Sequence, residues 1–138
     1  MIKNIILGGG CFWCTEAIFN NTSGIEKVLP GYTGGKTLNP TYKDICTGLT
    51  GHAEVISIDY NSEKINLENI LEIFFSTHDP TTLNRQGNDM GTQYRSSIFT
   101  DDKEEIKMIL DFIKTLDKSK NFKNKVVTTI ENKTTFYV

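Results

Sequence analysis

A short apolar run near the N-terminus, Ile5-Ile6-Leu7, ends in three consecutive glycines at residues 8–10. Such a run before a glycine-rich turn is typical of a buried strand, and residues 11–20 then have the pattern of a helix. Strand, turn and helix must follow one another closely, which leaves Cys11 at the helix N-terminus. Unpaired N–H groups and the helix dipole stabilise an anion there, so the position favours a thiolate, the nucleophilic form of cysteine.

Two aromatic residues and a second cysteine follow Cys11 directly. Phe12 and Trp13 indicate an apolar pocket beside the reacting sulfur. Cys14 is three residues after Cys11, and the two lie close together if both belong to the first helical turn. The C-x-x-C pattern alone fits a thioredoxin-like redox pair, a metal site, or a nucleophile with an unrelated neighbour.

Length and composition exclude several classes of protein. The 138 residues suit one domain with its own core, and we expect residues 1–138 to form a single catalytic domain. A net charge of −2 with mixed signs gives no basic surface for nucleic acid. The N-terminal apolar run is too short for a signal peptide or a membrane span. We therefore expect a cytoplasmic monomer that binds neither nucleic acid nor a membrane.

Three cysteines, an odd number, argue against a disulfide framework and favour thiol chemistry or a metal. A three-cysteine, one-histidine zinc set is available in Cys11, Cys14, Cys46 and His52, and a non-catalytic zinc module is one alternative function. The bulk of the two aromatic residues between the first two cysteines argues against it, because tight metal knuckles favour small residues. Cys46 is more simply interpreted as a small buried apolar side chain. A generic thioredoxin-like disulfide exchanger is the other alternative.

The remaining pattern predicts an α+β fold with two layers, a sheet covered on one side by helices. Further strands are expected at 28–32, 53–60, 94–99, 126–130 and 136–138, and long loops at 34–50 and 78–93. Amphipathic helices are expected at 66–77 and around the apolar positions 106, 109, 110 and 113. Asp101 and Glu104 resemble a capping box at the start of the second of these helices.

Glu54 lies on the apolar face of an alternating strand. In the segment 53–60, Glu54 shares one face with Ile56, Ile58 and Tyr60. Desolvation on such a face favours the neutral form of a carboxylic acid, which can then donate a proton. The pattern equally allows Glu54 to lie at a solvated rim of the sheet.

Other titratable residues are weaker candidates. Glu16 follows Cys11 by five residues, about 140° around a helix, so it should not face the same pocket. His52 and His78 are interpreted as hydrogen-bonded structural histidines, because nothing in the sequence places either beside Cys11.

Three long blocks together resemble the peptide methionine sulfoxide reductase A family. They are GCFWCTE at residues 10–16, NPTYKDICTGLTGHAEV at 39–55 and HDPTTLNRQGNDMGTQYRS at 78–96. The resemblance implies a ferredoxin-like α+β sandwich with a mixed sheet and helices on one face. It also implies reduction of the S-epimer of methionine sulfoxide, free or in proteins, through a sulfenic acid on Cys11.

The same resemblance implies a role for each site residue. Cys11 would be the nucleophile, Glu54 the acid, and Phe12 and Trp13 the wall that holds the substrate methyl group. Tyr42 and Tyr94 would hydrogen-bond the sulfoxide oxygen, and Asp89 would support them. No metal or organic cofactor is implied, and the reductant would be an external thiol, thioredoxin or a similar donor.

The sequence departs from the family pattern after Cys46. Many members regenerate through a cysteine near the C-terminus, but no cysteine follows Cys46 here. The chain stops at Val138, where members commonly continue, so we expect the family's C-terminal segment to be absent. Cys14 is then the favoured resolving thiol, Cys46 the second and an external thiol the third. The strain of bridging two cysteines in one helical turn argues against Cys14.

Overall fold

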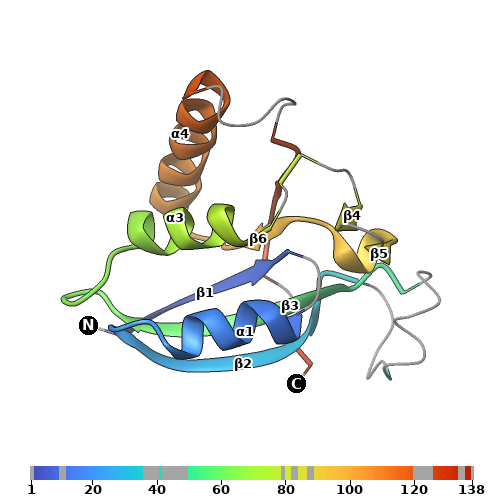
Figure 1. Ribbon diagram of the computed structural model, residues 1–138, viewed down its shortest axis with the longest axis horizontal. Helices are drawn as coiled ribbons and strands as arrows, with labels where there is room; N and C mark the ends of the chain where they lie inside the picture. Colours follow the sequence, from blue (N-terminus) through green and yellow to red (C-terminus); the bar gives the residue numbers. More distant parts are fainter. Residues whose placement is uncertain are drawn as a thin grey trace.

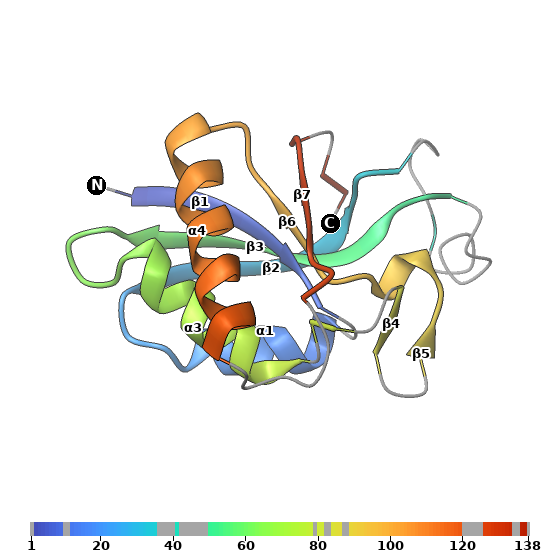
Figure 2. The same cartoon turned by 90° about the horizontal axis from the view of Figure 1, so that it is seen from above.

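The computed structural model describes residues 2–9, 12–35, 41, 50–78, 80–81, 84–86, 89–119, 126–133 and 136–137, and the account below concerns these. Five strands form one sheet in the order β2-β3-β1-β6-β7 (Figures 1 and 2). Their bounds are β1 (Ile2–Gly8), β2 (Ile25–Thr33), β3 (Ala53–Asn61), β6 (Ser97–Phe99) and β7 (Thr129–Glu131). The helices are α1 (Phe12–Asn20), α3 (Leu67–Thr77) and α4 (Lys103–Ser119).

The sheet is mixed, as the resemblance implied. β1 pairs antiparallel with β3 and β6, β2 pairs antiparallel with β3, and β6 and β7 are parallel. The elements β1, α1, β2, β3, α3 and β6 follow the βαββαβ order of ferredoxin-like folds. The predicted α+β class is therefore confirmed. None of the helices in the described part of the chain is long and apolar enough to cross a bilayer.

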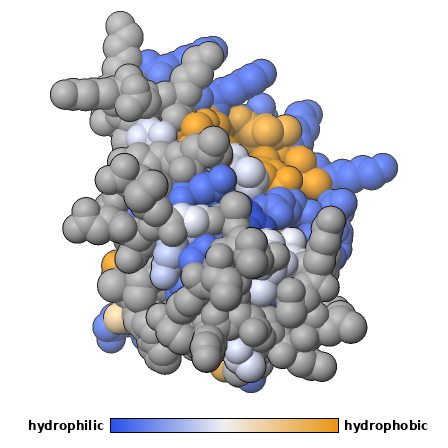
Figure 3. All heavy atoms as spheres, turned by 90° about the vertical axis from the view of Figure 1, so that its right-hand side faces the viewer, coloured by the Kyte–Doolittle hydropathy of each residue, from blue (hydrophilic) through white to orange (hydrophobic). Residues whose placement is uncertain are grey.

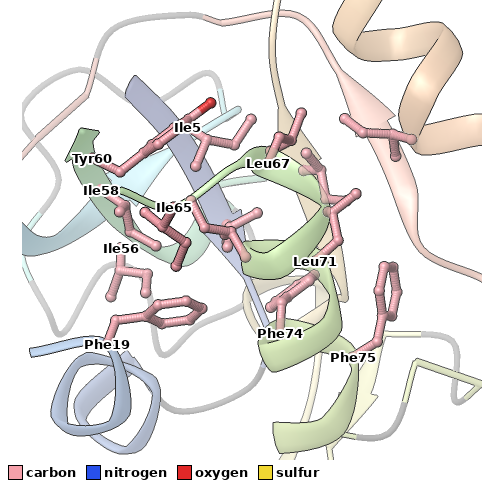
Figure 4. Close-up of a cluster of buried hydrophobic side chains, with 14 of the residues drawn as sticks. Ile5, Phe19, Ile56, Ile58, Tyr60, Ile65, Leu67, Leu71, Phe74 and Phe75 are labelled. Atoms are coloured by element: carbon pink, nitrogen blue, oxygen red, sulfur yellow. The ribbon is translucent and has the colours of Figure 1, made fainter. Parts of the chain in front are cut away.

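The main core lies between the sheet and all three helices. Ile56 and Ile58 of β3 are fully buried in one cluster with Phe19 of α1, Phe74 of α3 and Ile109 of α4. Figure 4 shows Phe19 and Phe74 approaching this face of the sheet from their two helices. Burial of such side chains stabilises the fold by about 1.5–3 kcal/mol each. Since residues of all three helices join this one cluster on the Ile56 and Ile58 face of β3, the three helices cover the same face of the sheet.

The second face of β3 is also buried at the start of the strand. Ala53 and Val55 have no exposed surface and form a smaller cluster with Ile6 and Phe99, against which Phe136 packs. Alternation correctly predicted the face of β3 that points to the helices. It missed this second cluster, because the residues that cover it come from β6 and the C-terminal part of the chain.

Side-chain caps begin both longer helices. Asn66 accepts a hydrogen bond from the backbone N–H of Asn69 at 2.8 Å, and Asn69 accepts one in return, which completes a capping box for α3. At α4, Asp102 Oδ1 accepts from the N–H groups of Glu104 and Glu105. The predicted cap, Asp101, was therefore one residue too early.

Several predicted loops and strands differ from the structure. Within the predicted loop 78–93, β4 (Arg85–Gln86) and β5 (Asp89–Met90) form a short hairpin, followed by the 3₁₀ helix η1 (Thr92–Tyr94). The strand predicted at 94–99 begins only at Ser97. Two-residue strands are too short to produce an alternating pattern, which explains why sequence analysis missed the hairpin. In the C-terminal segment, Tyr137 pairs with Tyr32 at the edge of β2 through two backbone hydrogen bonds.

Candidate active site

The glycine turn after β1 lies beside the start of β3. Leu7 pairs with Ile56 across the two strands, so Glu54 lies just beyond the last pair. A β-carbon built on Gly8 would be only 3.2 Å from the carbonyl oxygen of Glu54. The end of β1 therefore passes directly along the backbone of Glu54. Cys11 itself lies outside the described residues.

Position 9, directly after β1, has room only for glycine. A β-carbon on Gly9 would lie 2.9 Å from Cγ of His78 and 3.0 Å from Cε1 of Phe74. Phe74 lies on the core side of α3 and His78 at the end of that helix, and the two rings are in contact with centroids 4.2 Å apart. Overpacking of this kind forces side chains or backbone to move. The glycines predicted as a simple strand terminator thus also allow β1 to pass close to α3.

Glu54 is buried, with 4% of its surface exposed. It shares the helix-facing side of the sheet with Ile56, and Tyr32 of β2 lies opposite it in register. Tyr32 is itself 8% exposed. These observations exclude the solvated-rim alternative for Glu54. Sequence analysis missed Tyr32, because its position opposite Glu54 depends on the register between two strands.

Tyr94 lies at the same end of the sheet. It is the last residue of η1, which packs against β3, and it is half-buried. Ser97, three residues later, pairs with Gly8 at the end of β1. The structure therefore brings three separate segments together: the turn before Cys11, the start of β3 with Glu54, and η1 with Tyr94. On this side of the molecule the described residues are largely polar, apart from an apolar patch in the upper part of Figure 3.

The other predicted site residues are only partly described. Asp89 pairs with Gln86 in the β4–β5 hairpin, which contacts η1, but its side chain is not among those described. The same is true of the side chains of Phe12, Trp13 and Cys14, which occupy the first turn of α1. Tyr42 and Cys46 lie outside the described residues.

Both histidines are hydrogen-bonded, as predicted. The two ring nitrogens of His78 are 2.7 Å from the carbonyl oxygen of Phe74 and 2.8 Å from Oγ of Ser96. His52 is 2% exposed, and its Nδ1 accepts a hydrogen bond from the N–H of Gly35 at 3.0 Å. Among the described residues, which omit all three cysteine side chains, no cluster of potential ligands suits a metal ion.

Sequence analysis also missed Arg95 and Gln93, the two residues that flank Tyr94. The Arg95 side chain bonds to Glu131 of β7 and to the backbone of Gly51. Gln93 is 4% exposed, and its Oε1 has no hydrogen-bond partner in the described structure. The same holds for Oε2 of Glu16 in α1. No sequence signal identifies the partners of Arg95, because they are 36 and 44 residues away.

Comparison with known proteins agrees with this arrangement. The peptide methionine sulfoxide reductase family model matches residues 3–138. The chain is 50% identical over 137 residues to the peptide methionine sulfoxide reductase MsrA of Trichodesmium erythraeum, across 99% of this chain and 77% of that protein.

Solved structures give the same relationship. Reduced Mxr1 from Saccharomyces cerevisiae superimposes with a TM-score of 0.91 at 37% identity, covering 99% of this chain and 78% of that one. Mxr1 in complex with Trx2 superimposes with a TM-score of 0.73 at 27% identity, covering 99% and 79% of the two chains. The sequence match extends over nearly the whole chain, and the shared fold includes the strand–turn–helix unit that precedes and follows Cys11. This chain therefore belongs to the peptide methionine sulfoxide reductase family.

Proposed function

We propose that this enzyme reduces the S-epimer of methionine sulfoxide, free or in proteins, with Cys11 as nucleophile and Glu54 as proton donor. Family membership supplies the reaction class, thiol-dependent reduction of methionine sulfoxide. The observation that carries the assignment is the close approach of the Gly8–Gly9 turn to the backbone of a buried Glu54. Cys11 follows Gly9 by two residues in the sequence, which supports a position of the substrate sulfoxide near the same end of β3.

The sulfoxide oxygen is a poor leaving group, so the reaction requires a proton as well as a nucleophile. The Cys11 thiolate forms a bond to the substrate sulfur while Glu54 delivers a proton to the oxygen. The S–O bond of the substrate and the new bond between Cys11 and the substrate sulfur both break, and the OH group ends on Cys11 as a sulfenic acid. Two electrons pass from the cysteine sulfur to the substrate, which leaves as the thioether methionine. Burial of Glu54 supports this role because desolvation favours a neutral, proton-bearing carboxyl group.

Recognition of the substrate is assigned to the residues around this centre. The rings of Phe12 and Trp13 suit the substrate methyl group and the polarizable sulfur. The hydroxyl groups of Tyr42 and Tyr94 would stabilise the polarised S–O bond, and Asp89 would support them. The location of Tyr94 in η1, against β3, supports its part in this set.

Regeneration needs a second thiol. A resolving thiolate attacks the Cys11 sulfenic acid, releases water and forms a disulfide, which an external dithiol then reduces. Cys14 is the first candidate, Cys46 the second and direct attack by an external thiol the third. The solved complex of Mxr1 with Trx2 supports a thioredoxin-like donor here too. The cycle uses only thiols, needs no metal or organic cofactor, and suits the cytoplasm, where thiols are kept reduced.

A comparison of substrate epimers tests the proposed function. We expect the purified protein with dithiothreitol to reduce the S-epimer of a methyl aryl sulfoxide and to leave the R-epimer almost untouched. The measurement is chiral chromatography of the remaining sulfoxide after incubation of the racemate. Reduction of the R-epimer alone, or equal consumption of both epimers, would contradict the proposal.

The resolving cysteine is tested by one turnover without external reductant. One equivalent of the S-epimer should yield one equivalent of methionine or thioether and a Cys11–Cys14 disulfide, detected by peptide mass spectrometry. The Cys14→Ser variant should still complete this first turnover, whereas a generic disulfide exchanger would lose all activity. A Cys11–Cys46 disulfide would instead assign regeneration to Cys46. A Cys11 sulfenic acid that persists beside free Cys14 and Cys46 thiols would assign it to an external thiol. Cys46→Ser serves as the matched control.

A further inference from the structure

The guanidinium of Arg95 connects three segments of the chain. Its Nε and Nη2 donate to the two carboxylate oxygens of Glu131 at 3.0 and 3.1 Å, in a bidentate ion pair. Its Nη1 donates to the carbonyl oxygen of Gly51 at 3.0 Å. Only 12% of the Arg95 side chain is exposed, so solvent screens these bonds less than it screens a surface ion pair.

Two of these segments carry a residue of the proposed active site. Gly51 precedes Glu54 by three residues, at the entry to β3. Arg95 itself follows Tyr94 directly. The carboxylate of Glu131 is fixed in turn by the hydroxyl of Thr129, which donates to Oε2 at 2.7 Å. Arg95, which directly follows the proposed hydroxyl donor Tyr94, is therefore bonded to the backbone just before the proposed acid Glu54.

The residue that follows β2, Gly34, also lies close to the Arg95 guanidinium. Gly34 has a φ of +86°, and a β-carbon on it would lie 2.9 Å from Nη2 of Arg95. Gly34 follows Tyr32, the residue opposite Glu54, by two positions. A side chain at position 34, directly after β2, would meet both the Phe99 ring, at 2.7 Å, and the guanidinium, so the chain here packs closely against both groups.

We propose that Arg95 is a positioning residue that sets the separation of Glu54 and Tyr94, so that both groups act on the same sulfoxide oxygen. This inference rests on the proposed function. Proton transfer and oxyanion stabilisation depend on placement within a fraction of an ångström, and small displacements reduce rates many-fold. A planar guanidinium supplies three bonds in fixed directions, whereas a lysine ammonium lacks the bidentate fork. The charge alone is therefore insufficient.

The test compares Arg95→Lys and Arg95→Gln with the wild type in single-turnover reduction of the S-epimer. We expect the first-turnover rate to fall about 10- to 100-fold in both variants, with KM changed less than about threefold. The rate of Cys11 alkylation by iodoacetamide should stay unchanged, because the proposed role of Arg95 is to place Glu54 and Tyr94 rather than to activate the thiol. Glu131→Gln, which keeps the shape of the partner, should lower the rate by a smaller factor.

A matched control separates positioning from general stability. Glu105→Gln weakens the 2.7 Å hydrogen bond that the hydroxyl of Thr100 donates to Glu105 in the first turn of α4. This bond lies away from Gly8 and η1, so the turnover rate should stay unchanged. A double-mutant cycle gives the decisive readout: in a Glu54→Gln background, Arg95→Lys should have little further effect on the rate. Full additivity with Glu54→Gln, or Arg95 variants that unfold more easily but keep the wild-type rate, would overturn the inference.

The same cycle distinguishes two kinds of failure. If Glu54→Gln alone keeps the wild-type rate, the proposed function of Glu54 is wrong. If Glu54→Gln is inactive while Arg95→Lys and Glu131→Gln are fully active, only the positioning role is wrong. If neither Arg95 variant folds, Glu131→Gln is measured in the wild type and in the Glu54→Gln variant. These rates then give the double-mutant cycle instead.

Discussion

Replacement of Cys11 by serine should abolish sulfoxide reduction. The hydroxyl of serine is not ionised at neutral pH and is a far weaker nucleophile towards sulfur, and no sulfenic acid can form on it. Loss of a nucleophile of this kind lowers the rate by about 10⁴-fold or more. The measurement is release of thioether from the S-epimer, in a single turnover and with dithiothreitol in excess.

The other two cysteines provide the controls for this variant. Cys14→Ser and Cys46→Ser should each release one equivalent of product in the first turnover, since neither thiol attacks the substrate. Thermal unfolding of Cys11→Ser should match that of the wild type, because the variant only replaces one sulfur atom by an oxygen atom before the first turn of the helix. Activity that persists without Cys11 would show that a different residue is the nucleophile.

Replacement of Glu54 by glutamine should reduce the rate of the first turnover by about 10²- to 10⁴-fold, the range typical of a lost general acid. The amide has nearly the same volume, so the packing against Ile56 and Tyr32 is preserved, but it cannot transfer a proton to the sulfoxide oxygen. We expect KM to change little, because the acid acts mainly on the developing charge. Single-turnover rates over a range of pH are the measurement: the wild-type rate should fall where Glu54 loses its proton, and the variant should lack this decline.

Two comparisons make the result specific. Glu26→Gln removes a carboxylate from an exposed position of β2 and should leave the rate unchanged. Alkylation of Cys11 in Glu54→Gln should proceed at the wild-type rate, because the acid acts on the substrate rather than on the thiol. A fully active Glu54→Gln variant would remove Glu54 from the mechanism and leave the tyrosines as the candidate proton donors.

The strand–turn–helix unit could be predicted because its signals are local. The apolar run, the glycines and the helical pattern all lie within the first 20 residues, and β1 and α1 occur at residues 2–8 and 12–20. The helices at 67–77 and 103–119 could be predicted for the same reason, since their apolar spacing repeats within each segment. The β4–β5 hairpin could not, because its two-residue strands carry no periodic pattern.

The proposed active site was predictable only in part. Alternation placed Glu54 on the face of β3 that points to the helices, but it left open whether that end of the strand is buried or solvated. That depends on α1, β2 and the Gly8–Gly9 turn, which come from other parts of the chain. The role proposed for Arg95 could not be predicted from the sequence. A single arginine beside a tyrosine forms no periodic pattern, and its partner, Glu131, is 36 residues away.

The chain's local chemistry was therefore present in the linear sequence: a cysteine at a helix N-terminus, aromatic neighbours, a carboxylic acid on an apolar strand face, and three blocks shared with one family. The folded arrangement added the relations between these groups. It buried Glu54, set Tyr32 opposite it, brought η1 against β3, and connected the segments of Gly51, Arg95 and Glu131 through the Arg95 side chain. The physical reason is that propensity and periodicity act over a few residues, whereas burial, strand register and ion pairing depend on segments that meet only when the sheet and its helices pack together.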